Sequence, residues 1–89
     1  MTKIIFSSAF TRALKKLLNA QPNLEPLIRE RFDTFQKDPI DPSLHTHRLG
    51  GDLKKYRSFR ITYDIRVIFE FTKDGEAIFS DIGTHNDVY

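Results

Sequence analysis

The chain has 89 residues, of which 39% are hydrophobic and 12% aromatic, and this predicts one folded domain over residues 1–89. It has no cysteine, no run near the ~20 apolar residues that cross a membrane and no N-terminal signal, so we expect a cytoplasmic protein without disulfides, thiolate chemistry or membrane contact. Its net charge of +2 is compatible with a nucleic acid or an acidic protein as partner.

The first part of the chain is predicted to form a strand and two helices. Residues 3–7 read as a short strand, and Ser7 or Ser8 then offers a hydroxyl that can cap a helix. Apolar residues follow at helical spacing in two stretches that the NAQPN segment separates. The second helix is expected to end at Asp38, because the proline that follows disfavours helical backbone. Together these stretches predict a helical hairpin.

A long connection and a β-hairpin follow. Residues 37–53 contain two prolines and two adjacent glycines, and so read as an irregular loop of the kind that is usually functional or mobile. Alternating apolar and polar residues over 56–71 then predict two half-buried strands. A three-residue connection at 62–64 would set Arg60 directly opposite Arg66.

The last strand is predicted over residues 76–82, after the turn signal Lys73-Asp74-Gly75. Alternation does not decide which of its residues face inward. Gly83 is expected to end the strand, and a short tail follows. The element order β-α-α-β-β-β predicts an α+β fold, with a small antiparallel β-sheet and an N-terminal helical hairpin packed on one face.

Positive charge is concentrated in the β-hairpin and in the segment before it. Two like charges directly opposite each other on paired strands are destabilising, so the arginine pair makes most sense beside an anionic ligand. Between residues 48 and 66, two aspartates accompany six basic residues: Arg48, Lys54, Lys55, Arg57, Arg60 and Arg66.

The polar residues expected around the open face of the sheet could cleave RNA without a metal ion. One group would remove the ribose 2′-OH proton, another would protonate the leaving 5′ oxygen, and cations would stabilise the phosphorane. His47 and His85 suit both proton transfers, because the unperturbed pKa of histidine is about 6.5. Asp64 at the hairpin turn and Lys54 from the loop complete the set.

Each of these residues also has a simpler interpretation. The histidines could be ordinary surface residues, and Asp64 could only shape its turn. His45-Thr46-His47 could begin a metal site, but a structural zinc site needs four ligands, so no metal is expected. Gly50-Gly51 is too short for a phosphate-binding loop, and no cofactor is expected. The basic cluster could equally be a solvated surface: Lys54, Lys55 and Arg57.

The second half of the chain contains three segments whose residues and spacing are characteristic: His47-x-Leu49-x-Gly51-x-Leu53-x-x-Tyr56-Arg57-x-x-Arg60-Ile61, Asp64-x-Arg66-Val67-Ile68-Phe69, and Ile82-Gly83-Thr84-His85-x-Asp87-Val88-Tyr89. With these segments the chain resembles the RelE/ParE superfamily of type II toxins, and it is most similar to the YafQ branch of mRNA interferases. The first half matches only in pattern.

The resemblance implies a ribosome-dependent endoribonuclease that cuts mRNA in the decoding site and that a cognate antitoxin silences. By position, His47 and Asp64 become candidates for activating the nucleophile or positioning the RNA, and His85 becomes the leading general acid. Tyr89 matches an aromatic position that helps to hold the substrate. The YafQ pattern has histidine at Arg60, and an arginine cannot act as a general base, so Arg60 is expected to clamp a phosphate. The remaining residues expected to bind RNA are Arg66, Lys54, Lys55 and Arg57.

Two alternatives use the same scaffold. A non-enzymatic toxin of the ParE type would inhibit DNA gyrase, and its open face would not need convergent proton-transfer groups. His47 and His85 argue against this alternative without excluding it. An inactive relative retained as a binding module is the other possibility.

Overall fold

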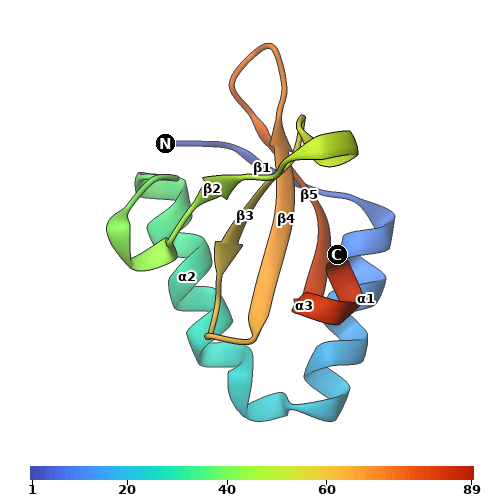
Figure 1. The fold of residues 1–89 in the computed structure, drawn as a ribbon. Coiled ribbons are helices and arrows are strands. Elements are labelled where there is room, and N and C mark those ends of the chain that lie inside the picture. The colour runs from blue at the N-terminus through green and yellow to red at the C-terminus, as the bar shows by residue number, and fades with distance from the viewer.

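The structure, a computed structural model, describes residues 1–89 apart from the side chain of Asp87. Its five-stranded sheet has the order β1-β5-β4-β3-β2. The two long helices cover one face of this sheet, and the opposite face stays open (Figure 1). In chain order the elements are β1 (Ile4–Phe6), α1 (Ser8–Ala20), η1 (Pro22–Leu24), α2 (Glu25–Lys37), η2 (Pro42–Leu44), β2 (His47–Arg48), η3 (Gly51–Leu53), β3 (Arg57–Arg60), β4 (Ile65–Phe71), β5 (Ala77–Thr84) and α3 (His85–Val88).

The α+β architecture with a helical hairpin on one face is confirmed. The Ser7 hydroxyl caps α1 by accepting a hydrogen bond from the Phe10 amide at 3.0 Å. Helix α2 ends at Lys37, just before Asp38-Pro39, as predicted. No helix in the described part of the chain combines the length and the apolar character that a bilayer span requires.

Two predicted features of the sheet differ from the structure. The sheet is not wholly antiparallel, because β1 pairs with β5 in parallel, with Ile4 opposite Ala77. The chain between these two strands, residues 7–76, includes both long helices and strands β2, β3 and β4, and it supplies the long connection that a parallel pair needs. Strand β5 does not end before Gly83 but continues to Thr84, and the short tail that follows contains a helical turn at residues 85–88.

A β-bulge explains why alternation could not assign the inward face of the last strand. Ile68 pairs with Asp81 but Phe69 pairs with Phe79, so one extra residue, Ser80, lies in β5. The insertion shifts the alternation by one position. Ala77 and Phe79 therefore face the core before the bulge, and Ile82 faces it after the bulge.

Aromatic rings form most of the core between the sheet and the helices. The fully buried Phe79 ring lies at its centre, with ring centroids from both long helices and from β3 and β4 within 5.1–6.2 Å. These neighbours come from distant parts of the chain: Phe10, Phe32, Phe35, Phe59 and Phe69. The packing fixes which face of β3 and β4 is covered and therefore which face stays open.

The loop before the hairpin is more ordered than its composition predicts. Asp41 accepts hydrogen bonds from the Ser43 amide at 2.9 Å and hydroxyl at 2.7 Å, and these bonds lower the pKa of the Asp41 carboxyl. Leu44 is fully buried, and the Thr46 hydroxyl donates to the Pro39 carbonyl at 2.6 Å. The loop therefore delivers β2, including His47, to a defined place at the edge of the sheet.

Candidate functional site

Arg60 and Arg66 face each other on the open side of the sheet. They are paired across β3 and β4, in the register that the sequence predicts. Their neighbours Phe59, Ile61 and Val67 point into the core, so alternation places both arginines on the opposite face. The ion pairs among the described residues join other cations, at Lys3–Glu76 and Arg29–Glu25, and neither site arginine has a carboxylate partner.

The arginine pair has unused hydrogen-bond donors. The Nε atom of each guanidinium is buried and has no partner among the described residues. Arg66 Nη2 donates to the Tyr63 carbonyl at 3.4 Å, and the Arg60 guanidinium lies 5.7 Å from the centre of the Tyr63 ring. Buried donors without partners cost stability, and a bound oxyanion would satisfy them together with both charges.

His47 lies in β2, in register with Ser58 on β3. Its Nδ1 is 3.1 Å from the carbonyl oxygen of His45, and a carbonyl only accepts, so Nδ1 carries the proton. In the neutral ring Nε2 then carries the lone pair, which the Ser58 hydroxyl faces. This Nε2 lies 3.4 Å from the hydroxyl of the fully buried Ser58. The geometry makes Nε2 of His47 able to accept a proton.

His85 and Tyr89 approach His47 from the C-terminal end of the chain. Their rings pack edge to face, with centroids 4.4 Å apart. The helical turn α3 places them beside the loop after β2, and a shallow depression of about 360 Å³ lies between the two segments. His47 and His85 therefore line the same depression, and their catalytic roles stay a prediction. The lining consists of His47, Arg48, Leu49, Gly50, Leu53, His85 and Tyr89.

Asp64 lies at the turn between β3 and β4, two positions before Arg66. Its side chain is exposed, and its backbone amide donates to the Thr62 hydroxyl at 3.2 Å. The residue does not line the depression between the histidines. The structure thus places Asp64 at the turn that joins the two arginine-bearing strands, outside the depression that the two histidines line.

The other basic residues occupy different surroundings. Lys54 and Lys55 are exposed directly after η3, next to the rim of the depression. Arg57 pairs with Phe69 and so belongs to the helix-covered side of the sheet. Its guanidinium lies 5.0 Å from the centre of the Phe71 ring. The structure does not bring Arg57 to the arginine pair.

Two residues of this region were not among the predicted site residues. Alternation puts Ser58 on the same face as Arg60, but nothing in the sequence indicates that its hydroxyl meets His47. Tyr63 falls within the predicted connection at 62–64. An aromatic residue in a tight turn between two arginines was the available signal. Within the described side chains, no three His, Cys, Asp or Glu residues come close enough together to hold a metal ion.

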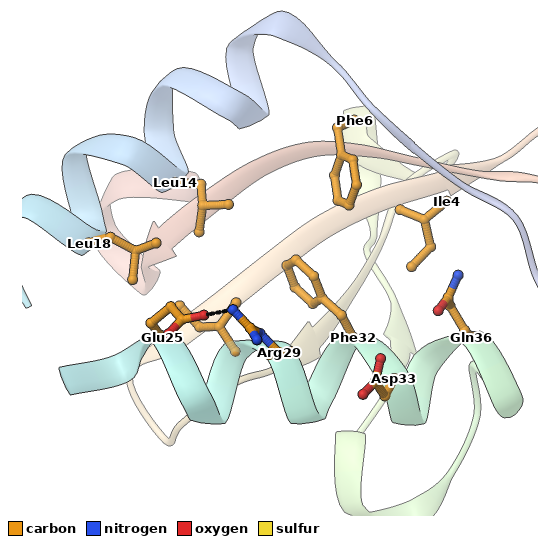
Figure 2. A pocket seen from close by; sticks show the side chains of 10 residues that line it. Ile4, Phe6, Leu14, Leu18, Glu25, Arg29, Phe32, Asp33 and Gln36 are labelled. Atoms are coloured by element: carbon orange, nitrogen blue, oxygen red, sulfur yellow. Dashed lines mark hydrogen bonds and ion pairs between the residues drawn. The ribbon is translucent and has the colours of Figure 1, made fainter. Parts of the chain in front are cut away.

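A second cavity lies on the helix-covered side of the sheet, between α1, α2 and β1 (Figure 2). It is called the groove between α1 and α2 below. It measures about 390 Å³ and is mainly apolar. The Glu25–Arg29 ion pair lies on its α2 rim, and Phe6, which is 50% exposed, points into it from β1. Its apolar lining comes from three elements: Ile4, Phe6, Leu14, Leu18, Ile28 and Phe32.

Comparisons with known proteins find matches that span the whole chain. Residues 2–89 match the family model described as "Bacterial toxin of type II toxin-antitoxin system, YafQ". No curated protein matches the chain. A copper-bound mutant toxin from Helicobacter pylori is 28% identical, with a TM-score of 0.82 and 100% of both chains covered. YafQ from E. coli strain BL21(DE3) is 20% identical, with a TM-score of 0.81 over 100% of this chain and 99% of that one. The toxin in an E. coli DinJ-YafQ toxin-antitoxin complex is 20% identical, with a TM-score of 0.79 over 99% and 97% of the two chains.

Proposed function

Because this chain belongs to the YafQ family of toxins from bacterial type II toxin-antitoxin systems, we propose that it is a ribosome-dependent endoribonuclease that cleaves mRNA in the decoding site. The observation that carries the proposal is the facing pair Arg60 and Arg66, whose buried Nε donors lack partners among the described residues. A phosphate group of RNA supplies the acceptor oxygens and the negative charge that this pair lacks.

The proposed reaction is a transfer of the phosphoryl group within the RNA. Nε2 of His47 accepts the proton of the ribose 2′-OH, and the oxygen attacks the adjacent phosphorus. His85 donates a proton to the 5′ oxygen as its bond to phosphorus breaks. The products are a 2′,3′-cyclic phosphate and a 5′-hydroxyl end. Arg60 and Arg66 stabilise the negative charge of the phosphorane, which is strongest in the transition state.

The remaining residues are assigned to substrate binding. Tyr89 offers its ring to a base of the RNA, because it packs against His85 at the wall of the depression. Lys54 and Lys55 are exposed at the rim, where they can contact neighbouring phosphates. Asp64 is the second candidate for the base, since a carboxylate at the turn between the two arginine-bearing strands could also accept the 2′-OH proton.

We further propose that a cognate antitoxin neutralises this toxin, as the E. coli DinJ-YafQ complexes show for a protein of the same fold. The apolar groove between α1 and α2 fits the apolar stripe of an amphipathic segment (Figure 2). Helix α1 has three exposed cations and no acidic residue, so an acidic flank on that segment would complement it: Arg12, Lys15 and Lys16. The partner segment is therefore expected to be amphipathic and acidic.

Induction of the wild type and of His85→Ala in bacteria tests the nuclease proposal. The wild type should arrest growth and produce new 5′ ends within codons of ribosome-bound mRNA, and His85→Ala should do neither. Equal growth arrest by both proteins would contradict the catalytic assignment. A supercoiling assay with purified DNA gyrase separates the ParE-type alternative, which predicts inhibition of gyrase without RNA cleavage.

A further inference from the structure

We propose that Tyr63 is a stacking platform for one nucleobase of the mRNA, next to the phosphate that Arg60 and Arg66 hold. This inference rests on the proposed function and extends it to a residue outside the acid-base set. The Tyr63 side chain is 79% exposed at the turn between β3 and β4. An aromatic ring this exposed, beside a site for an anion, matches the combination of aromatic and cationic groups that holds single-stranded RNA.

Both arginines of the candidate site contact Tyr63. The Arg60 guanidinium lies 5.7 Å from the centre of its ring, and Arg66 Nη2 donates to its carbonyl at 3.4 Å. The platform and the phosphate donors are therefore parts of one unit. A nucleotide bound at this unit would place its phosphate at the guanidiniums and a base against the ring.

The turn that carries Tyr63 is held by several hydrogen bonds. The Thr62 hydroxyl accepts from the amides of Asp64 at 3.2 Å and Ile65 at 3.0 Å. The Ile61 amide donates to the Ile65 carbonyl at 2.8 Å, and Arg31 of α2 donates to the Ile61 carbonyl at 3.3 Å. The ring thus projects from a defined backbone, which reduces the entropy lost when a base stacks on it.

The other exposed aromatic side chains are placed differently. Phe6 lies in the groove between the helices, and Phe71 shares the helix-covered face with Ala77. Tyr89 borders the depression with His85. Tyr63 and Tyr89 can therefore contact two different bases, one beside the arginine pair and one beside the histidines.

Single-turnover cleavage of mRNA on stalled ribosomes tests the role of Tyr63. Tyr63→Ala should raise the toxin concentration that gives half-maximal cleavage by about 5- to 150-fold, the range expected for loss of one base-aromatic stack. Tyr63→Phe keeps the ring and should behave like the wild type. Thermal unfolding of both variants should match the wild type, because the side chain is mostly exposed.

The base side of the contact is tested with mRNAs that contain one abasic nucleotide in the codon, placed at each position in turn. At the stacked position, the abasic substitution and Tyr63→Ala should not be additive, because each removes the same contact. Tyr56→Ala is the matched control, since Tyr56 also has a cation over its ring, Lys55 at 5.1 Å, and lies away from the arginine pair. Its effect should be additive with every abasic position.

The outcomes distinguish this inference from the proposed function. Cleavage by the wild type with an unchanged half-maximal concentration for Tyr63→Ala would overturn the stacking role alone. Additivity at all codon positions would do the same. A wild type that leaves ribosome-bound mRNA intact would overturn the nuclease proposal and this inference with it.

Discussion

Arg60 and Arg66 stand directly opposite each other on β3 and β4, and each keeps a buried Nε donor without a partner among the described residues. This arrangement lowers the stability of the folded protein in two ways. Like charges repel across the strand pair, and an unpaired buried donor costs about 1–3 kcal/mol. A bound phosphate would remove both costs. In the free protein, the two guanidiniums therefore have charge and hydrogen-bond donors available for an anion.

Replacement of one arginine should therefore lower activity without lowering the stability of the folded protein. We expect Arg66→Thr to lower cleavage of ribosome-bound mRNA by at least ~10-fold, because one charged donor to the phosphorane is lost. Threonine suits a strand, and the cross-strand repulsion of about 0.2–1 kcal/mol disappears, so the free energy of unfolding should stay equal or rise. Cleavage kinetics and urea unfolding measure the two effects.

Inorganic phosphate is a direct probe of the same pair. Phosphate should raise the melting temperature of the wild type and have a smaller effect on Arg66→Thr, since a ligand that binds only the native state stabilises it. Arg12→Ala removes an exposed cation from α1 and is the matched control, with the phosphate effect unchanged. If Arg66→Thr unfolds as readily as a core variant and still responds fully to phosphate, the arginine has a structural role.

His45 and His47 should differ sharply in function. His47→Ala should reduce the cleavage rate by about 10²–10⁴-fold, the usual contribution of a general base. His45→Asn is the control, because His45 supplies only its carbonyl to His47, and asparagine tolerates the positive φ of 51° at this position. If Asp64→Asn abolishes cleavage while His47→Ala does not, the carboxylate is the base.

The arginine pair could be predicted from the sequence because it depends on local geometry. Strict alternation and a three-residue turn fix which residues of β3 and β4 oppose each other, and Arg60 and Arg66 follow from that register. The inward residues of β5 could not be predicted in the same way. No pattern in the sequence signals the bulge at Ser80. The packing of Phe79 among the helices decides which residues of β5 face inward.

That His47 and His85 line one depression does not follow from any local rule in the sequence. The two side chains come from a two-residue edge strand and from a helical turn after β5, and no local rule relates these elements. The composition of the preceding loop predicted irregular structure. The buried Leu44 and the cap at Asp41 fix that loop, and burial in the folded chain is a tertiary effect.

The aromatic core gives a prediction about stability. Phe79→Ala should lower the free energy of unfolding by about 3–5 kcal/mol, because the ring lies fully buried among six other phenylalanines and leaves a cavity. Ile40→Ala, at a position 74% exposed, should change it by less than about 0.5 kcal/mol. Urea unfolding of both variants is the measurement. A small effect at Phe79 would mean that the core repacks.

The groove between α1 and α2 gives a prediction about the antitoxin. Phe6→Glu should weaken binding of the cognate antitoxin by at least ~10-fold, because it places an unpaired carboxylate where an apolar side chain would be buried. Isothermal titration with the purified antitoxin measures the change, and thermal unfolding verifies the fold of the variant. Cleavage of ribosome-bound mRNA should persist, since Phe6 lies on the helix side of the sheet.

Ile40→Glu is the matched control for this variant, because Ile40 is an exposed apolar residue that does not line the groove. It should bind the antitoxin like the wild type. In cells, co-expressed antitoxin should rescue growth in the presence of Ile40→Glu and fail to do so with Phe6→Glu. Equal rescue of both variants, together with unchanged affinity for Phe6→Glu, would place the antitoxin on another surface.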